Sequence, residues 1–284
     1  MKRRLFTLGL LFCVAAWGSI PARIVSTSPS ITETLFALGL GNHVVGVTTY
    51  DRYPPAVLKL PKIGSFSDPD PEKIAVLRPD LVIIHRSFPR LAERLSAVNI
   101  RYTEIDVISL ADIYVMISDI GRATGVPDRA GKLNLSIKAR LDTVREETAG
   151  RKRPSVLMLV GRNPGVLTGM IAIAPGSYLG ELIEIAGGRN VLTGTAIAYP
   201  HISMETVLRL DPDVILDASY MGDASGDTQK QAEMLRGPWL SHHEIRAVRN
   251  GMIFGLPSEA LVTPGPRVID AVETIRNAIR KTAP

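Results

Sequence analysis

One stretch of this sequence occurs twice in closely similar form. Residues 72–83 (EKIAVLRPDLVI) and 205–216 (ETVLRLDPDVIL) align at an offset of 133 positions. Each copy has the pattern of a short helix with apolar residues at helical spacing, a Pro-Asp turn that ends it, and a β-branched apolar run typical of a buried parallel strand. The repeat predicts two similar α/β lobes. It also predicts a crevice at the carboxyl ends of their strands, where open α/β folds bind ligands.

The amino terminus has the layout of a secretory signal. A basic start, Met1 to Arg4, precedes an apolar run from Leu5 to Ala16 and then a stretch of small residues. The run is shorter than the roughly 20 apolar residues that a bilayer-spanning helix needs. We therefore expect residues 1–22 to be a signal peptide, cleaved after Gly18 or Ala22, and the mature protein to be extracytoplasmic.

The charge and cysteine content exclude several classes. The formal net charge is +5, and the start of the chain supplies three of these charges, so the mature chain carries only about +2. No basic stripe with interleaved aromatic residues is present, which disfavours nucleic-acid binding. The only cysteine, Cys13, lies inside the signal and matches a lipoprotein cleavage site poorly. We expect neither a disulfide nor a lipid anchor.

A long amphipathic helix separates the two copies of the repeat. Apolar residues recur at spacings of three and four, with charged residues between them, at Ala130, Leu133, Ile137, Leu141 and Val144. A helix of this length spans about 30 Å. The predicted organisation is thus an N-terminal α/β lobe over 23–126, a spanning helix over 127–149 and a C-terminal α/β lobe over 150–284.

Several of these features together resemble one family. They are the signal, the Ser28-Pro29-Ser30 start, the motif Val47-Thr48-Thr49-Tyr50 followed by Tyr53-Pro54-Pro55, the paired Pro-Asp units and the single spanning helix. The chain resembles the periplasmic substrate-binding proteins of ABC importers for metal chelates, which bind cobalamin, ferric siderophores or haem, and its motifs are closest to the cobalamin-binding members. The resemblance implies two Rossmann-like lobes joined by one long α-helix. It also implies a monomeric, non-enzymatic receptor that serves a permease dimer at the inner membrane and needs no cofactor beyond its chelate ligand.

The resemblance also assigns a role to one glutamate in each copy of the repeat. In similar members of the family, a glutamate near the start of the repeat helix in each lobe docks onto basic permease residues, and the matching positions are Glu72 and Glu205. Each follows an expected helix cap, Asp70 or Ser203, by two residues. The alternative is that both merely complement the positive helix end, a contribution of ~0.3–1 kcal/mol each. We expect docking.

Strand ends supply the candidate ligand-binding residues, because a cleft between α/β lobes lies at the carboxyl ends of their strands. Aromatic walls would give contact area and a few polar groups would orient the ligand. Tyr50, Tyr53 and Phe66 fit the aromatic role, and for each of them ordinary packing is the alternative. The candidates are Ser28, Pro29, Tyr50, Phe66, His85 and Arg86 in the first lobe and Arg162, His201, Tyr220 and Glu259 in the second.

Several ligands fit these residues. A corrinoid is the first choice, although Trp239 is the one tryptophan outside the signal, and cobalamin-binding members tend to place tryptophans around the ligand. A ferric siderophore could be held by Arg86, Arg162 and Tyr220. Haem would need an axial ligand such as His85 or His201.

Other site classes have weaker support in the sequence. The five histidines and the acidic residues show no metal-ligand spacing, so we expect no protein-bound metal ion. The competing functional class is a two-lobed periplasmic hydrolase or chelatase. The sequence contains none of the common catalytic motifs of such enzymes.

Overall fold

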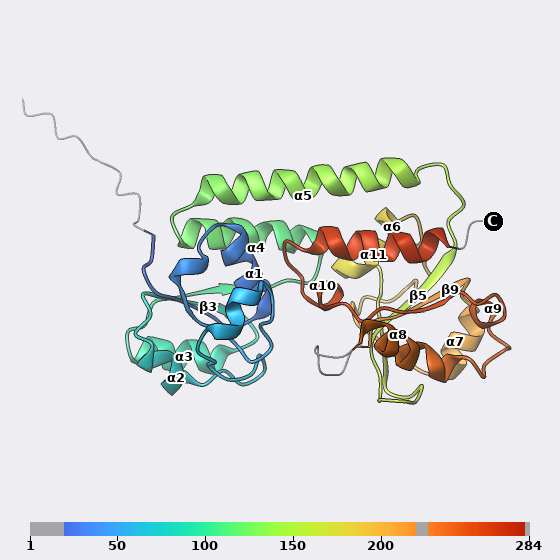
Figure 1. The fold of residues 1–284 in the computed structure, drawn as a ribbon, viewed down its shortest axis with the longest axis horizontal. Coiled ribbons are helices and arrows are strands. Elements are labelled where there is room, and N and C mark those ends of the chain that lie inside the picture. The colour runs from blue at the N-terminus through green and yellow to red at the C-terminus, as the bar shows by residue number, and fades with distance from the viewer. Residues whose placement is uncertain (1–19, 220–226, 282–284) are drawn as a thin grey trace, which may run out of the picture.

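The computed structural model describes residues 20–219 and 227–281, and it folds them into two α/β lobes bridged by one long helix (Figure 1). The α/β fold with parallel-rich sheets that the repeat predicted is confirmed. All but the last three residues of the predicted signal lie outside the described residues, as does Tyr220.

The first lobe is built on a four-stranded parallel sheet of order β2-β1-β3-β4. Apolar side chains fill both faces of its central strands, as expected for a parallel sheet covered by helices. Its strands are β1 (Ile24–Ser26), β2 (Val44–Gly46), β3 (Leu81–His85) and β4 (Tyr102–Ile105), and its helices are α1 (Pro29–Ala37), α2 (Pro71–Val76), α3 (Pro89–Ala97) and α4 (Leu110–Ala123), with short 3-10 helices η1 (Gly41–His43) and η2 (Pro55–Lys59).

The second lobe has a six-stranded mixed sheet. Strands β10, β9 and β5 are parallel neighbours, β7 pairs parallel with β5, and β6 and β8 extend the sheet in antiparallel fashion. The strands are β5 (Ser155–Gly161), β6 (Met170–Ala172), β7 (Arg189–Asn190), β8 (His201–Ile202), β9 (Val214–Asp217) and β10 (Ile253–Gly255). The helices are α6 (Tyr178–Ile185), α7 (Met204–Leu210), α8 (Thr228–Arg236), η3 (Gly237–Trp239), α9 (Arg246–Arg249), α10 (Glu259–Val262) and α11 (Val268–Arg280).

The repeated Pro-Asp unit performs the same structural task in both lobes. Asp80 Oδ2 accepts a hydrogen bond from the backbone N–H of Arg23, directly before β1, at 2.9 Å. Asp213 Oδ2 accepts one from the backbone N–H of Ser155, at the start of β5, at 2.8 Å. In each copy the aspartate therefore ties the helix–strand unit to the first strand of its own lobe.

Helix α5 (Pro127–Thr148) bridges the lobes, and it coincides with the long helix predicted from the sequence. It packs against α4 of the first lobe and against α6 and α11 of the second, and Figure 1 shows it running along one side of both lobes. Gly121 of α4 permits this contact, because a Cβ there would overlap the Cβ of Ala130. One continuous apolar cluster extends from the first sheet through these helices into the second lobe.

Polar contacts also join the lobes beside this helical layer. Glu181 Oε1 of α6 accepts a hydrogen bond from the N–H of Leu110, the first residue of α4, at 2.8 Å. The Tyr178 N–H donates to the carbonyl oxygen of Ile108 at 2.8 Å. A shared core and cross-lobe hydrogen bonds leave little freedom for a large hinge motion.

Candidate functional site

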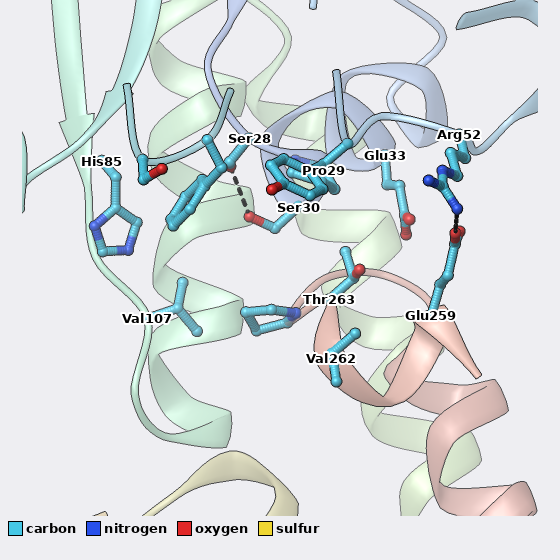
Figure 2. Close-up of a pocket in the computed structure, with 14 residues that line it drawn as sticks. Ser28, Pro29, Ser30, Glu33, Arg52, His85, Val107, Glu259, Val262 and Thr263 are labelled. Atoms are coloured by element: carbon cyan, nitrogen blue, oxygen red, sulfur yellow. Dashed lines mark hydrogen bonds and ion pairs between the residues drawn. The ribbon is translucent and has the colours of Figure 1, made fainter. Parts of the chain in front are cut away.

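A cavity of about 720 Å³ lies between the two lobes. Most of its lining comes from the first lobe, from the start of α1, the end of β3 and the loops before α2 and after β2 and β4, and the rest comes from α10 and the residues after it. Figure 2 shows the α10 segment facing the start of α1 across this space. The lining residues are Ser28, Pro29, Ser30, Glu33, Tyr50, Arg52, Phe66, Ser67, His85, Val107, Glu259, Val262, Thr263 and Pro264.

The start of α1 forms one wall of the cavity. Ser28 is the N-cap of α1 and Pro29 its first residue. The Ser28 hydroxyl lies 3.0 Å from that of Ser30 (Figure 2). This wall therefore presents a pair of hydroxyl groups that can donate to or accept from a ligand.

Aromatic side chains supply much of the apolar surface of the cavity. Tyr50 and Phe66 are both exposed there although both are large and apolar. The Phe66 ring packs edge-on against His85, with centroids 6.0 Å apart, and against Phe88 at 5.4 Å. Exposed aromatic faces that are held in place by neighbouring rings are typical of a site for a flat, partly apolar ligand.

His85 is the histidine that lines the cavity among the described residues. Its Nδ1 lies 2.8 Å from the Ser87 hydroxyl, and its Nε2 lies 3.5 Å from Asp106 Oδ1. Burial lowers the pKa of His85 more than the nearby Asp106 raises it. The imidazole is therefore mainly neutral at pH 7.

Two ion pairs cross between the lobes at the cavity. Arg267 binds Glu33 through both Nε, at 2.8 Å, and Nη2. Arg52 Nη1 lies 3.5 Å from Glu259 Oε1, and Figure 2 shows this pair linking the loop after β2 to α10. Burial raises the pKa of Glu33 even though Arg267 opposes that shift. Every charged side chain that lines the described cavity, apart from the neutral His85, therefore has an opposite charge beside it.

The structure brings together only part of the predicted set. Ser28, Pro29, Tyr50, Phe66 and His85 of the first lobe and Glu259 of the second line the cavity. Arg162 and His201 of the second lobe do not line it, and Tyr220 lies outside the described residues.

Arg162 is a correction to the sequence-based prediction. It lies at the end of β5, as expected, but its side chain is only 3% exposed and turns into the lobe. Its Nε donates to Asp217 Oδ2 at 2.8 Å, and its Nη2 donates to the carbonyl oxygen of Leu235 at 2.9 Å. The same Asp217 oxygen accepts a hydrogen bond from the Trp239 indole. A buried, fully engaged guanidinium is not available to an anionic ligand.

Arg86 and His201 are also corrections. Arg86 follows His85 at the end of β3 but is exposed and does not line the cavity. His201 lies in β8, the last strand on its side of the second sheet, and is exposed as well. The rule that binding residues lie at the carboxyl ends of strands (the strand-end rule) gives the position of a residue in the fold. It does not give the direction of its side chain.

Sequence reasoning missed part of the lining. Ser30 and Ser67 adjoin predicted residues, and a wider window around the strand ends would have included them. Thr263 follows Glu259 on the same segment. The ion pairs could not have been found in this way, because Glu33 and Arg267 lie 234 positions apart with no motif linking them. The remaining missed residues are Arg52, Val107, Val262 and Pro264.

The two repeat glutamates lie at matching places in the fold. Glu72 is in the first turn of α2, capped by Asp70, and Glu205 is in the first turn of α7, capped by Ser203. Both are exposed. In Figure 1, α2 and α7 lie on different lobes, on the side of the molecule away from α5. This arrangement leaves both carboxylates free to meet a partner.

Within residues 20–219 and 227–281, no three histidine, cysteine, aspartate or glutamate side chains are grouped so that they could hold a metal ion. In the same part of the chain, no helix has both the length and the apolar character needed to cross a membrane. Among the described lining residues, the Ser28 hydroxyl contacts Ser30 and the His85 ring contacts Ser87, so these two groups do not form a hydrogen-bonded nucleophile–base pair.

Fold and cavity together define a two-lobed α/β binding protein with a rigid helical bridge. The chain belongs to the periplasmic binding protein family, whose model matches residues 24–260. A vitamin B12-binding protein of Vibrio cholerae is 29% identical over 255 residues, which cover 89% of this chain and 87% of that protein.

Solved structures agree with this assignment. The periplasmic vitamin B12-binding protein BtuF of Vibrio cholerae superposes with a TM-score of 0.75 at 27% identity, covering 93% of this chain and 99% of that one. The periplasmic haem-binding protein RhuT of Roseiflexus sp. RS-1, in its apo form, gives a TM-score of 0.77 at 26% identity, covering 94% and 100%. The chain is thus an ABC-transporter substrate-binding protein whose relatives include vitamin B12-binding and haem-binding proteins.

Proposed function

We propose that this protein is an extracytoplasmic receptor that captures a corrinoid in the inter-lobe cavity and passes it unaltered to an ABC permease. The observation that carries the choice of ligand is the balance of charge in the cavity. Arg52 is paired with Glu259, Glu33 is paired with Arg267, and burial lowers the pKa of His85. A site of this kind favours a neutral ligand, since an anion would meet no unpaired cation among the described lining residues.

The remaining lining suits a corrinoid in two further ways. Tyr50 and Phe66 offer aromatic area to a large, flat macrocycle. The hydroxyls of Ser28, Ser30 and Thr263 can hydrogen-bond the amide groups that surround a corrin ring. Amides both donate and accept, and hydroxyls match them without adding charge.

Haem is the second candidate ligand, and one observation favours it. His85 lines the cavity beside Phe66, and its Nε2 has only a 3.5 Å contact with Asp106. Turning that nitrogen toward the cavity would supply an axial ligand for haem iron. A ferric siderophore has less support, since neither Arg86 nor Arg162 lines the cavity.

Delivery to the permease is the second half of the proposal. Glu72 and Glu205 would dock onto basic residues of the two permease subunits, one from each lobe. Their exposure and their matching positions on α2 and α7 support this role. The protein would act as a monomer in the periplasm, reaching it through the predicted signal peptide and without a lipid anchor.

A ligand panel tests this proposal. Purified protein is titrated by calorimetry with cyanocobalamin, haemin and a ferric hydroxamate siderophore, and the bound ligand is recovered and checked by its absorption spectrum. We expect one cyanocobalamin to bind per chain, more tightly than the other two, and to be released unchanged. Tightest binding to haemin would transfer the assignment to the second candidate. Recovery of an altered chelate would indicate an enzyme.

A further inference from the structure

Four charged side chains meet where the two lobes face each other across the cavity. The first lobe contributes Glu33 from α1 and Arg52 from the loop after β2, and the second contributes Glu259 from α10 and Arg267 just before α11. Each lobe therefore supplies one positive and one negative charge. The charges pair across the gap, Glu33 with Arg267 and Arg52 with Glu259.

The two pairs differ in how firmly they are held. The side chains of Glu33 and Arg267 are 2% and 18% exposed, their contact is bidentate, and the Arg267 guanidinium also lies over the Tyr53 ring at 4.3 Å. The Arg52 and Glu259 side chains are 33% and 31% exposed and are joined by a single contact of 3.5 Å. The first pair is fixed within the structure, whereas the second can change partners at little cost.

Only the loosely held pair can respond to the charge of a ligand. Both Arg52 and Glu259 line the cavity, whereas Arg267 does not. Glu33 lines it too, but both of its carboxylate oxygens are bound by Arg267. Among the described lining residues, Arg52 is thus the cation that could bind an anionic group of a ligand. In the structure its partner is the carboxylate of Glu259.

We propose that Arg52 and Glu259 form the charge-selecting pair of this cavity. Glu259 cancels the positive charge of Arg52 and so disfavours chelates that carry carboxylates, and its oxygens accept hydrogen bonds from ligand amides. The inference rests on the proposed function, because it names the feature that would let the site prefer a neutral corrinoid. It assigns selectivity to two residues that contribute little to the overall fold.

A purely structural role makes a different prediction. If the pair only tethers the lobes, removing either charge lowers the affinity for all ligands by a similar factor. If it selects by charge, the two single substitutions move selectivity in opposite directions. Glu259→Gln leaves Arg52 free to bind an anion, whereas Arg52→Gln leaves Glu259 to repel one.

The experiment compares two ligands that differ in one charge. They are cyanocobalamin and its monocarboxylate, in which one peripheral amide is hydrolysed. Affinities are measured by calorimetry for the wild type, Glu259→Gln, Arg52→Gln and the double variant. Asp119→Asn serves as the control, because it removes a paired carboxylate on α4 that is 30% exposed, close to the 31% of Glu259, and that does not line the cavity. Thermal melting followed by circular dichroism verifies that each variant is folded.

We expect the ratio of monocarboxylate to cyanocobalamin affinity to rise about fivefold to tenfold in Glu259→Gln and to fall by a similar factor in Arg52→Gln. The double variant should return toward the wild-type ratio, and Asp119→Asn should not change it. An unchanged ratio in both single variants overturns the inference. So does a shift of both in the same direction.

The proposed function fails if the wild type binds haemin in preference to cyanocobalamin. The pair is then tested with haemin itself, which carries two carboxylates. Tighter haemin binding by Glu259→Gln and weaker binding by Arg52→Gln would support the pair, and unchanged binding in both would reject it.

Discussion

Replacing Asp213 by asparagine removes the charge that joins the repeated helix–strand unit of the second lobe to β5. One oxygen of this carboxylate, Oδ2, accepts hydrogen bonds from the backbone N–H of Ser155 at 2.8 Å and from the Ser155 hydroxyl at 2.7 Å. The other, Oδ1, accepts from Arg246 Nη1 at 2.8 Å. We expect Asp213→Asn to reduce the stability of the protein measurably.

The size of the effect follows from the pKa of Asp213. Burial alone would raise this pKa, but hydrogen bonds from Ser155 and Arg246 and the charge of Arg246 outweigh burial and lower it from 3.8 to about 2. A shift of one pKa unit corresponds to about 1.4 kcal/mol. Because the side chain is a third exposed and partly screened, we discount the full value to about 1–2 kcal/mol.

The lowered pKa of Asp213 also determines how the stability difference changes with pH. A carboxyl group with a lowered pKa in the folded state stabilises the fold above its ordinary pKa, and that contribution disappears as the pH falls through the folded-state pKa. The free energy of unfolding of the wild type should therefore exceed that of Asp213→Asn by about 1–2 kcal/mol at pH 7. The gap should narrow between pH 3.8 and about 2.

Urea unfolding followed by circular dichroism, repeated over this pH range, measures the gap. The matched control is Asp80→Asn in the first lobe, which removes the corresponding carboxylate. Asp80 accepts one hydrogen bond from the backbone N–H of Arg23 and has no arginine partner among the described residues, so its replacement should cost less. Equal stability of the wild type and Asp213→Asn, or a difference that does not change with pH, would show that the Asp213 charge does not stabilise the fold.

Three further predictions concern the lobe contact, the permease and the cavity. Glu33→Gln should lower the free energy of unfolding in urea by about 2–3 kcal/mol, because it leaves the half-buried Arg267 without its anion; an unchanged value would mean that the pair contributes nothing. Reversing the charge at both Glu72 and Glu205 should abolish cobalamin uptake by cells while leaving cyanocobalamin affinity intact, and a loss of affinity would contradict the docking role. Phe66→Ala should weaken cyanocobalamin binding about tenfold in a calorimetric titration, and full affinity would place the ligand elsewhere.

Much of the fold could be predicted because it depends on local patterns. The Pro-Asp repeat predicted the two helix–strand units, and the three- and four-residue spacing of apolar positions predicted α5. Capping residues such as Asp70 and Ser203 marked the starts of the repeat helices. In these elements the hydrogen bonding and burial of each residue depend mainly on near neighbours in the chain.

The candidate site was less predictable because it depends on contacts between distant segments. The strand-end rule identified first-lobe residues such as Tyr50 and His85, since parallel strands end at one edge of the sheet. It failed for Arg162, whose orientation is set by Asp217, 55 positions away. The cross-lobe pair of Glu33 and Arg267 has no local signature at all. Side-chain direction and ion pairing follow from tertiary packing, which periodicity does not encode.

If a corrinoid occupies the cavity between the lobes, its cobalt atom lies there and can be located by X-ray diffraction. Crystals grown with cyanocobalamin and measured at the cobalt absorption edge give an anomalous difference map. We predict a single strong peak within the space bounded by Tyr50, Phe66 and Glu259, inside density for an intact corrin ring. A peak outside that space, or no peak at a cyanocobalamin concentration that saturates the protein in solution, would show that the corrinoid does not bind between the lobes.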